Sequence, residues 1–290
     1  MKSNLFALIF SAIIIFGCNN SNQPKMSDKK NETFESGYAP VNGLKMYYEI
    51  HGTGGMPLVL IHGGGSTIES SFSNILPLLA KNRKVIAVEL QAHGRTSDRD
   101  SSESFQQDAD DVAGLLQYLK INKADFFGFS NGGHTTMEIA MRHPAIVNKL
   151  VIASSFYKRN GVIPGFFEGM EHASLENMPK PLQTAYLKVA ADKNGLQVMF
   201  NRDKERMLRF KDWGDDDMRS IKAPTLLILG DHDVVTPEHA VEMSHIIPKA
   251  QLMILPGDHG SYIGEVCTAK PGSRIPAFTV SVIEEFLNNQ

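Results

Sequence analysis

Short apolar runs alternate with helical patterns along most of the chain, and this alternation predicts the fold. Continuous apolar runs are typical of strands that a sheet buries on both faces. Strands are expected at 46–50, 58–61, 84–90, 125–129, 149–153, 225–229 and 251–255, with a further strand that begins at residue 38 and ends at the turn Val41-Asn42-Gly43. Apolar residues at helical spacing predict helices at 69–81, 104–120, 131–142, 237–247 and 276–288. Such alternation indicates an α/β fold, a mostly parallel sheet with helices on both faces.

The alternation stops between residues 155 and 222. This stretch has helical pieces and no clear buried strand, and it contains many aromatic residues and methionines. They are Phe156, Tyr157, Phe166, Phe167, Met170, Tyr186, Met199, Phe200, Phe210 and Trp213. We expect residues 155–222 to form a small helical cap over a core made of residues 38–154 and 223–290.

The N-terminal segment has the pattern of a targeting signal. Lys2 precedes an almost unbroken apolar run that is too short to span a membrane, which needs about 20 residues. The run ends in Ile15-Phe16-Gly17-Cys18, which resembles the bacterial lipobox, where the cysteine is lipidated and becomes the new N-terminus. We expect a lipoprotein signal peptide over 1–17, a flexible polar tether over 18–37, and an exported protein anchored to a membrane of the bacterial cell envelope, on the outer-membrane or periplasmic side. The alternative is an ordinary cleaved signal with an unmodified Cys18.

Composition narrows the function classes. The chain has 290 residues, 42% of them hydrophobic, which is enough for one large domain with a modest insertion. The net charge is -3 and no long block of like charge occurs, so the sequence shows no basic region of the kind that binds nucleic acid. Of the two cysteines, lipidation of Cys18 would leave only Cys267, so no internal disulfide is expected. Cys267 is expected to be a small structural residue and not a nucleophile.

A candidate nucleophile stands where a predicted strand meets a predicted helix, at Gly128-Phe129-Ser130-Asn131-Gly132. This is the G-x-S-x-G elbow in the strand-turn-helix setting that it requires. The serine of such an elbow occupies a sharp turn, so its neighbours two residues away must be small. The turn exposes the hydroxyl of Ser130 beside the positive end of a helix.

A glycine loop, His62-Gly63-Gly64-Gly65, follows an earlier predicted strand. Glycines let the backbone approach an anionic oxygen closely, and a loop at this place supplies the second backbone donor of an oxyanion hole. We expect the N–H groups of Gly64 and Asn131 to bind the oxyanion. His62 is expected to be a structural residue that holds the loop.

The acid and base candidates follow the last two predicted strands. Asp231 and Asp233 come after the first of these strands, and His259 comes after the second. The histidine would accept the proton of the serine, and a carboxylate would fix its tautomer and stabilise the imidazolium. Asp233 stands directly before the apolar pair Val234-Val235, which is suited to anchor the loop, whereas Asp231 is expected to be a turn or capping residue.

Together these motifs resemble the α/β-hydrolase superfamily, in its branch with a cap. The loop Gln91-Ala92-His93-Gly94-Arg95-Thr96 looks like that branch's D-x-x-G-x-G-x-S segment, with Glu89 where Asp is common. The resemblance covers residue 38 to the C-terminus. It implies the α/β-hydrolase fold with a mostly parallel eight-stranded sheet, and it implies Asp233 as the acid, three residues after a glycine and ahead of an apolar pair.

These residues predict a serine hydrolase that cleaves an ester or lactone through an acyl-enzyme and needs neither metal nor organic cofactor. The small-molecule substrate is expected to be bulky and apolar, such as a macrolide lactone, if the aromatic residues of the cap line its site; the same residues would also suit the core of any small helical cap. Carbon–carbon bond or amide hydrolysis, a cofactor-free oxygenase and a non-catalytic ligand-binding protein of the same fold remain alternatives. A dehalogenase is disfavoured, because its nucleophile is an aspartate where this chain has Ser130.

Overall fold

A single eight-stranded sheet organises the protein in the computed structural model, which describes residues 34–289. The strand order is β1-β2-β4-β3-β5-β6-β7-β8, and every neighbouring pair from β4 to β8 is parallel, whereas β1 and β2 pair antiparallel at one edge. The bounds are β1 Glu35–Val41, β2 Leu44–His51, β3 Leu58–Ile61, β4 Val85–Val88, β5 Ala124–Phe129, β6 Val147–Ala153, β7 Thr225–Gly230 and β8 Ala250–Leu255. The prediction of a mostly parallel eight-stranded sheet is confirmed.

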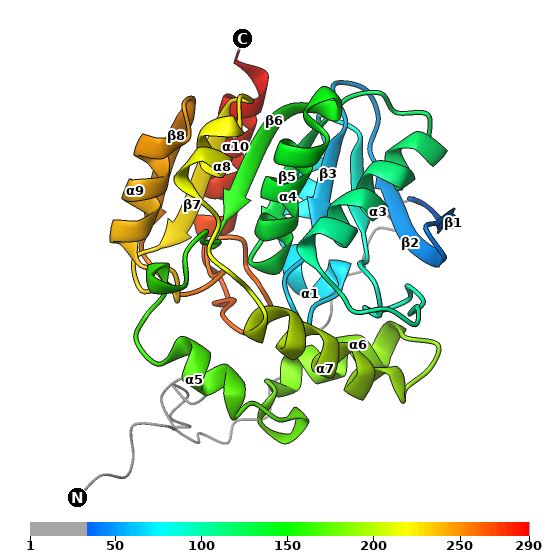
Figure 1. The fold of residues 1–290 in the computed structure, drawn as a ribbon. Helices are drawn as coiled ribbons and strands as arrows, with labels where there is room; N and C mark the ends of the chain where they lie inside the picture. Colours follow the sequence, from blue (N-terminus) through cyan, green and yellow to red (C-terminus); the bar gives the residue numbers. More distant parts are fainter. Residues whose placement is uncertain (1–33, 290) are drawn as a thin grey trace, which may run out of the picture.

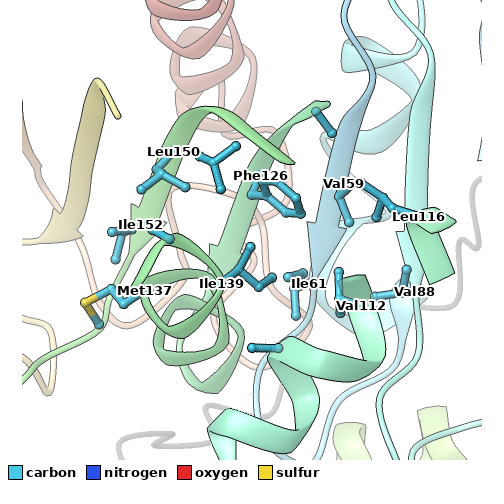
Figure 2. Packing of buried hydrophobic residues seen from close by; sticks show 14 of the residues in the cluster. Val59, Ile61, Val88, Val112, Leu116, Phe126, Met137, Ile139, Leu150 and Ile152 are labelled. Carbon is cyan, nitrogen blue, oxygen red and sulfur yellow. The ribbon is translucent and has the colours of Figure 1, made fainter. Parts of the chain in front are cut away.

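Helices cover both faces of the sheet (Figure 1). The first face carries α3 (Phe105–Tyr118), α4 (Asn131–Arg142), α8 (Asp215–Ser220) and α9 (Pro237–Ile246), and the second carries α1 (Ile68–Phe72), α2 (Leu76–Leu79) and α10 (Ile275–Asn288). Each central strand sends alternate side chains to the two faces, as Val59 and Ile61 do toward the first (Figure 2) and Leu58 and Leu60 toward the second. These strands are buried throughout, which explains their continuous apolar runs.

The expected helix at 69–81 is wrong in one respect, because it is broken into α1 and α2. Pro77 stands in the first turn of α2. Proline has no N–H to donate, and its ring clashes with the carbonyl four residues earlier, which is that of Ser73. Ser73 is where α1 ends, so a proline that the sequence displays sets the break.

The start of the core is also earlier than the expected residue 38. The strand β1 begins at Glu35, which pairs with Ile50 of β2. The last residues of the expected 18–37 tether therefore belong to the sheet. The expected signal peptide and Cys18 lie outside the described residues.

Between β6 and β7 the chain forms helices and no strand, over a stretch that the structure describes completely. It contains η2 (Arg159–Gly161), α5 (Phe166–Glu171), η3 (Leu175–Asn177), α6 (Lys180–Val189), α7 (Gly195–Leu208) and α8. The helices α5, α6 and α7 gather beyond one end of the sheet (Figure 1), whereas α8 packs beside α9 on the first face. Of the helices within residues 34–289, none has the length and apolar character needed to cross a membrane.

Candidate active site

Ser130 occupies the sharp turn between β5 and α4. Its backbone has φ 55° and ψ -120°, a conformation that costs a non-glycine residue about 1–3 kcal/mol. The flanking glycines are required by space, because a Cβ on Gly128 would lie 2.0 Å from the carbonyl oxygen of Gly132, and one on Gly132 would lie 2.1 Å from that of Ile61. The strained turn is thus held by close backbone contacts on both sides, and it presents the Ser130 hydroxyl to a cavity.

His259 bridges this serine and Asp233. Its Nε2 lies 3.1 Å from Ser130 Oγ, and its Nδ1 lies 2.6 Å from Asp233 Oδ1. Because the carboxylate accepts from Nδ1–H, the lone pair of Nε2 is free to face the serine hydroxyl. Burial lowers the pKa of His259, but attraction to Asp233 outweighs burial and raises that pKa above its ordinary value. The structure therefore brings together the three residues that the sequence predicts, from the ends of β5, β7 and β8.

Both carboxylate oxygens of Asp233 accept hydrogen bonds. Besides His259, its Oδ1 accepts from the amide of Val235 at 3.3 Å, and its Oδ2 accepts from the hydroxyl of Ser154. The hydroxyl of Tyr262 lies 2.5 Å from that of Ser154. Burial raises the pKa of Asp233, but the attraction of His259 outweighs it and lowers that pKa below the usual range.

Asp231, the competing acid, points elsewhere. Its Oδ1 accepts from the amide of Gly257 at 2.7 Å, whereas the carboxylate bonded to His259 Nδ1 is that of Asp233. The hydrogen bond to Gly257 links the loop after β7 to the loop after β8. Asp231 therefore has a structural role, in keeping with the turn or capping role expected for it.

The glycine loop after β3 leaves one amide free. The amide of Gly63 reaches Ser71 Oγ at 3.5 Å, and that of Gly65 donates to Asp203 Oδ2 at 2.5 Å. Within residues 34–289 the amide of Gly64 donates to no protein acceptor, and neither does that of Asn131, which as the first residue of α4 has no acceptor inside the helix. The two amides predicted for the oxyanion hole are therefore the ones available for a ligand.

His62 holds the glycine loop against the core. It is fully buried, the amide of Leu90 donates to its Nε2 at 3.1 Å, and its Nδ1 lies 2.8 Å from the carbonyl oxygen of Gly63. With Nε2 accepting, Nδ1 carries the proton and donates to Gly63. Burial lowers the pKa of His62 to about 3, so the neutral form persists.

A cavity of about 350 Å³ opens over these groups. Its floor contains Ser130, His259 and Gly64, and its walls are mostly apolar. The apolar wall residues include Phe129, Phe156, Phe166, Met170, Met178, Leu182, Met199, Phe200, Met207 and Val234. The cap aromatics thus divide between two roles, since Tyr157, Phe210 and Trp213 pack into apolar clusters and do not line the cavity.

Charged side chains are few in this cavity. Lys204 is the one Lys or Arg among its described lining residues, and its Nζ donates to the carbonyl oxygens of Glu171 and Ala173. Cys267 also lines the cavity, and burial raises the pKa of its thiol to about 12, so it is not a thiolate nucleophile. No cluster of His, Cys, Asp and Glu suited to a metal ion occurs in the part of the chain that the structure describes.

Sequence reasoning missed three polar residues at this site, namely Ser154, Asp203 and Tyr262. Ser154 and Tyr262 support Asp233, and Asp203 contacts the glycine loop. Asp203 lies 138 residues from its partner Gly65, in a helical stretch where a charged residue is usually solvated. The positive φ of Ser154 has no sequence signal either.

Comparison with known proteins gives a consistent result. A sequence model of the alpha/beta hydrolase fold family matches residues 56–198. The chain is 28% identical over 240 residues to the dihydrolipoyllysine-residue acetyltransferase component of an acetoin cleaving system from Pseudomonas putida, covering 75% of this chain and 62% of that protein. It is 37% identical over 111 residues to 2-hydroxymuconate semialdehyde hydrolase from Pseudomonas sp. strain CF600, covering 37% of this chain and 39% of that protein.

The fold also matches a solved structure, the enol-lactonase from Burkholderia xenovorans LB400. The TM-score is 0.67 with 24% sequence identity, and the match covers 87% of this chain and all of the other, 100%. The chain thus spans less than two thirds of the length of each of the two relatives compared by sequence, whereas the match to this structural neighbour covers that neighbour's whole length.

Proposed function

This chain belongs to the α/β-hydrolase superfamily, and from that membership we propose that it is a serine hydrolase that cleaves an ester or lactone. One observation carries the proposal. The imidazole of His259 lies between Ser130 Oγ, at 3.1 Å, and Asp233 Oδ1, at 2.6 Å, at the floor of a mostly apolar cavity. This arrangement of nucleophile, base and orienting acid is the one that acyl transfer requires.

The proposed reaction has two halves. Ser130 Oγ attacks the substrate carbonyl while His259 Nε2 accepts the serine proton, and the amides of Gly64 and Asn131 bind the resulting oxyanion. His259 then gives the proton to the leaving alkoxide, which departs as the alcohol. Water attacks the acyl-enzyme with the same proton relay and releases the carboxylic acid and free Ser130. Asp233 stabilises the imidazolium in both halves.

The walls of the cavity support an uncharged, apolar substrate. Phenyl rings and methionine side chains from the cap and the elbow form most of the apolar wall. Such walls bind hydrocarbon by burial, at about 25 cal/mol per Å². The proposed class is therefore esters or lactones with bulky apolar parts, including macrolide lactones.

Two measurements on purified protein test this function. The first is labelling by a fluorophosphonate probe, and the second is turnover of p-nitrophenyl esters and lactones of increasing size. We expect both in the native protein and neither in Ser130→Ala, which should fold normally. Labelling without turnover on any ester or lactone would favour a binding protein that keeps the site, and full turnover in Ser130→Ala would refute the serine mechanism.

Carbon–carbon bond hydrolysis is the second candidate, because one relative is named a 2-hydroxymuconate semialdehyde hydrolase. That substrate is an anion, and Lys204, the one Lys or Arg among the described wall residues, is already bonded to two backbone carbonyls. A neutral ester fits this lining better. Loss of the absorbance of 2-hydroxymuconate semialdehyde at a higher kcat/KM than for any ester would reverse this ranking.

A further inference from the structure

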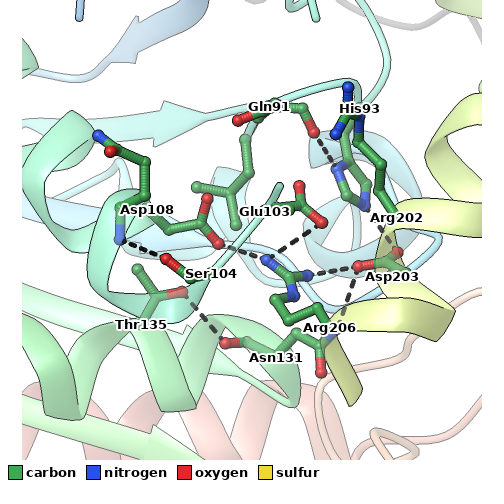
Figure 3. Close-up of polar contacts among 12 residues, drawn as sticks. Gln91, His93, Glu103, Ser104, Asp108, Asn131, Thr135, Arg202, Asp203 and Arg206 are labelled. Carbon is green, nitrogen blue, oxygen red and sulfur yellow. Dashed lines mark hydrogen bonds and ion pairs between the residues drawn. The ribbon is translucent and has the colours of Figure 1, made fainter. Parts of the chain in front are cut away.

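A buried polar cluster joins the cap to the core (Figure 3), and it bonds to the amide of Gly65 in the glycine loop. We name it the clasp, and it consists of Asp203 and Arg206 from α7, His93 from the loop after β4, and Glu103 and Asp108 at the start of α3. All five residues are at least nine-tenths buried, and ion pairs link them across more than 90 positions of sequence. The clasp is separate from the Ser130, His259 and Asp233 group.

Asp203 makes the contacts that matter for the site. Its Oδ2 accepts from the amide of Gly65 at 2.5 Å and faces His93 Nε2 at 2.9 Å. Its Oδ1 accepts from the side-chain amide of Asn131 at 3.2 Å and from Arg206. A single carboxylate of the cap therefore holds both chain segments that carry the free amides of the oxyanion hole.

We propose that Asp203 is a positioning residue that sets the geometry of the oxyanion hole, so that the hole is complete only when α7 is seated on the core. This inference rests on the proposed serine hydrolase function. The amide of Gly65 is occupied by Asp203, and this bond fixes the peptide that follows Gly64. A Cβ on Gly64 would lie 2.5 Å from Asn131 Nδ2 and 3.3 Å from Asp203 Oδ2, so the loop, the elbow and the cap are in close contact at this point.

A carboxylate near an oxyanion would oppose catalysis unless its charge were balanced. Two cations contribute to that balance here, and one of them, Arg206, also pairs with Glu103 and Asp108. Arg206 pairs with Asp203 from the next turn of α7, and His93 faces acceptors with both nitrogens, since its Nδ1 lies 2.8 Å from the carbonyl oxygen of Gln91. Two acceptors around one imidazole favour the doubly protonated ring. The clasp thus gives the loop a strong acceptor while its flanking cations offset the negative charge beside the site.

The test compares Asp203 with its neighbour on the same helix. Arg202 also ties α7 to the core, through Asp98 at 2.7 Å, but it touches neither the glycine loop nor the elbow. We expect Asp203→Ala to lower kcat on a p-nitrophenyl ester by about 10²-fold, the effect of losing one oxyanion donor, with KM changed less than threefold. We expect Asp203→Asn, which keeps an acceptor oxygen, to recover part of that loss, and Arg202→Gln to remain within threefold of the native kcat.

A second readout separates positioning from simple destabilisation. A trifluoromethyl ketone forms a tetrahedral oxyanion on the serine, so its inhibition constant should rise with the kcat loss in Asp203→Ala at a temperature where circular dichroism shows the variant folded. Native kcat in Asp203→Ala, or an equal loss in Arg202→Gln, would overturn the inference. A native protein that neither hydrolyses esters nor reacts with fluorophosphonate would instead refute the proposed function, so the two failures are distinguishable.

Discussion

At the scale of single residues, Asp233 and Asp231 offer a direct contrast. Asp233 Oδ1 accepts from His259 Nδ1 at 2.6 Å, whereas Asp231 bonds to the amide of Gly257. We expect Asp233→Asn to lower kcat by several orders of magnitude, because the histidine then takes the wrong tautomer, an effect of about 10⁴ in a serine protease. Asp231→Asn should cost less than about tenfold, or 1.4 kcal/mol. Kinetics of both variants on one ester decide the matter, and the reverse order would show that the acid is misassigned.

The pH dependence of kcat/KM should report the ionisation of His259. Only neutral His259 can accept the serine proton, so kcat/KM should rise with pH through one ionisation. Attraction to Asp233 raises the pKa of His259, so the midpoint should lie above the ordinary value of about 6.5. In Asp233→Asn that attraction is lost, and the midpoint of the residual activity should move down. A profile that stays flat from about pH 5 to 9 would argue against His259 as the base, because an ordinary imidazole titrates within this range.

Chemistry-bearing residues could be located from sequence where local chain geometry fixes them. Ser130 is marked by glycines that the elbow needs, and His259 and Asp233 follow apolar strands whose ends meet at one edge of the sheet. Asp203 and Ser154 could not be located, because their roles depend on partners 138 and 79 residues away. The neighbouring sequence does not distinguish Asp203 of the clasp from an aspartate that faces solvent on a helix.

At the scale of elements, strands and long helices followed the hydrophobic pattern closely. The helix α4 spans the predicted 131–142, and α3 starts after Ser104, whose hydroxyl accepts from the amide of Gln107 as an N-cap. The pattern failed where backbone chemistry opposed it, at Pro77 between α1 and α2. It also failed at β1, which lies at the edge of the sheet and is half exposed, so its apolar signal is weak.

The clasp between α7 and the core should make stability depend on pH. Burial lowers the pKa of His93, but attraction to Asp203 outweighs it and raises that pKa to about 9, and burial raises the pKa of Glu103 to about 8 despite Arg206 nearby. The folded protein therefore holds two protons that the unfolded chain releases at lower pH, near about 6.5 for His and about 4.3 for Glu. The free energy of unfolding should thus fall as pH rises from 6.5 to 9.

Urea unfolding at several pH values measures this effect. The His93 contribution is on the order of 3 kcal/mol over the window, since its pKa is raised from 6.5 to about 9 and each pKa unit is worth about 1.4 kcal/mol. His93→Gln should flatten the dependence, while His245→Gln, at an exposed position on α9, should leave it unchanged. Parallel pH profiles for the native protein and His93→Gln would refute a charged His93 in the clasp.

At the scale of the whole molecule, the cap and the core together build one site. The core supplies the proposed nucleophile, base and acid from strand ends, and the cap supplies most of the apolar walls together with Asp203. Hydrophobic pattern alone predicted two parts with an insertion between strands. It could not predict that the parts are joined by a buried ion-pair network. The residues near a charged side chain in the sequence do not indicate which distant residue it will pair with.

A lipid anchor at the N-terminus would attach the cap and core to the cell. The segment Ile15-Phe16-Gly17-Cys18 lies outside the described residues, and we propose from its sequence that Cys18 is lipidated after the signal peptide is removed. A diacylated cysteine supplies the two-chain anchoring that a single acyl chain does not, at about 0.8 kcal/mol per buried CH₂. The protein should then fractionate with membranes, and Cys18→Ser should shift it to the soluble fraction while the fluorophosphonate labelling of Ser130 stays unchanged. Intact-mass analysis of the mature protein should find Cys18 as the modified first residue, and cleavage elsewhere without lipid would contradict the proposal.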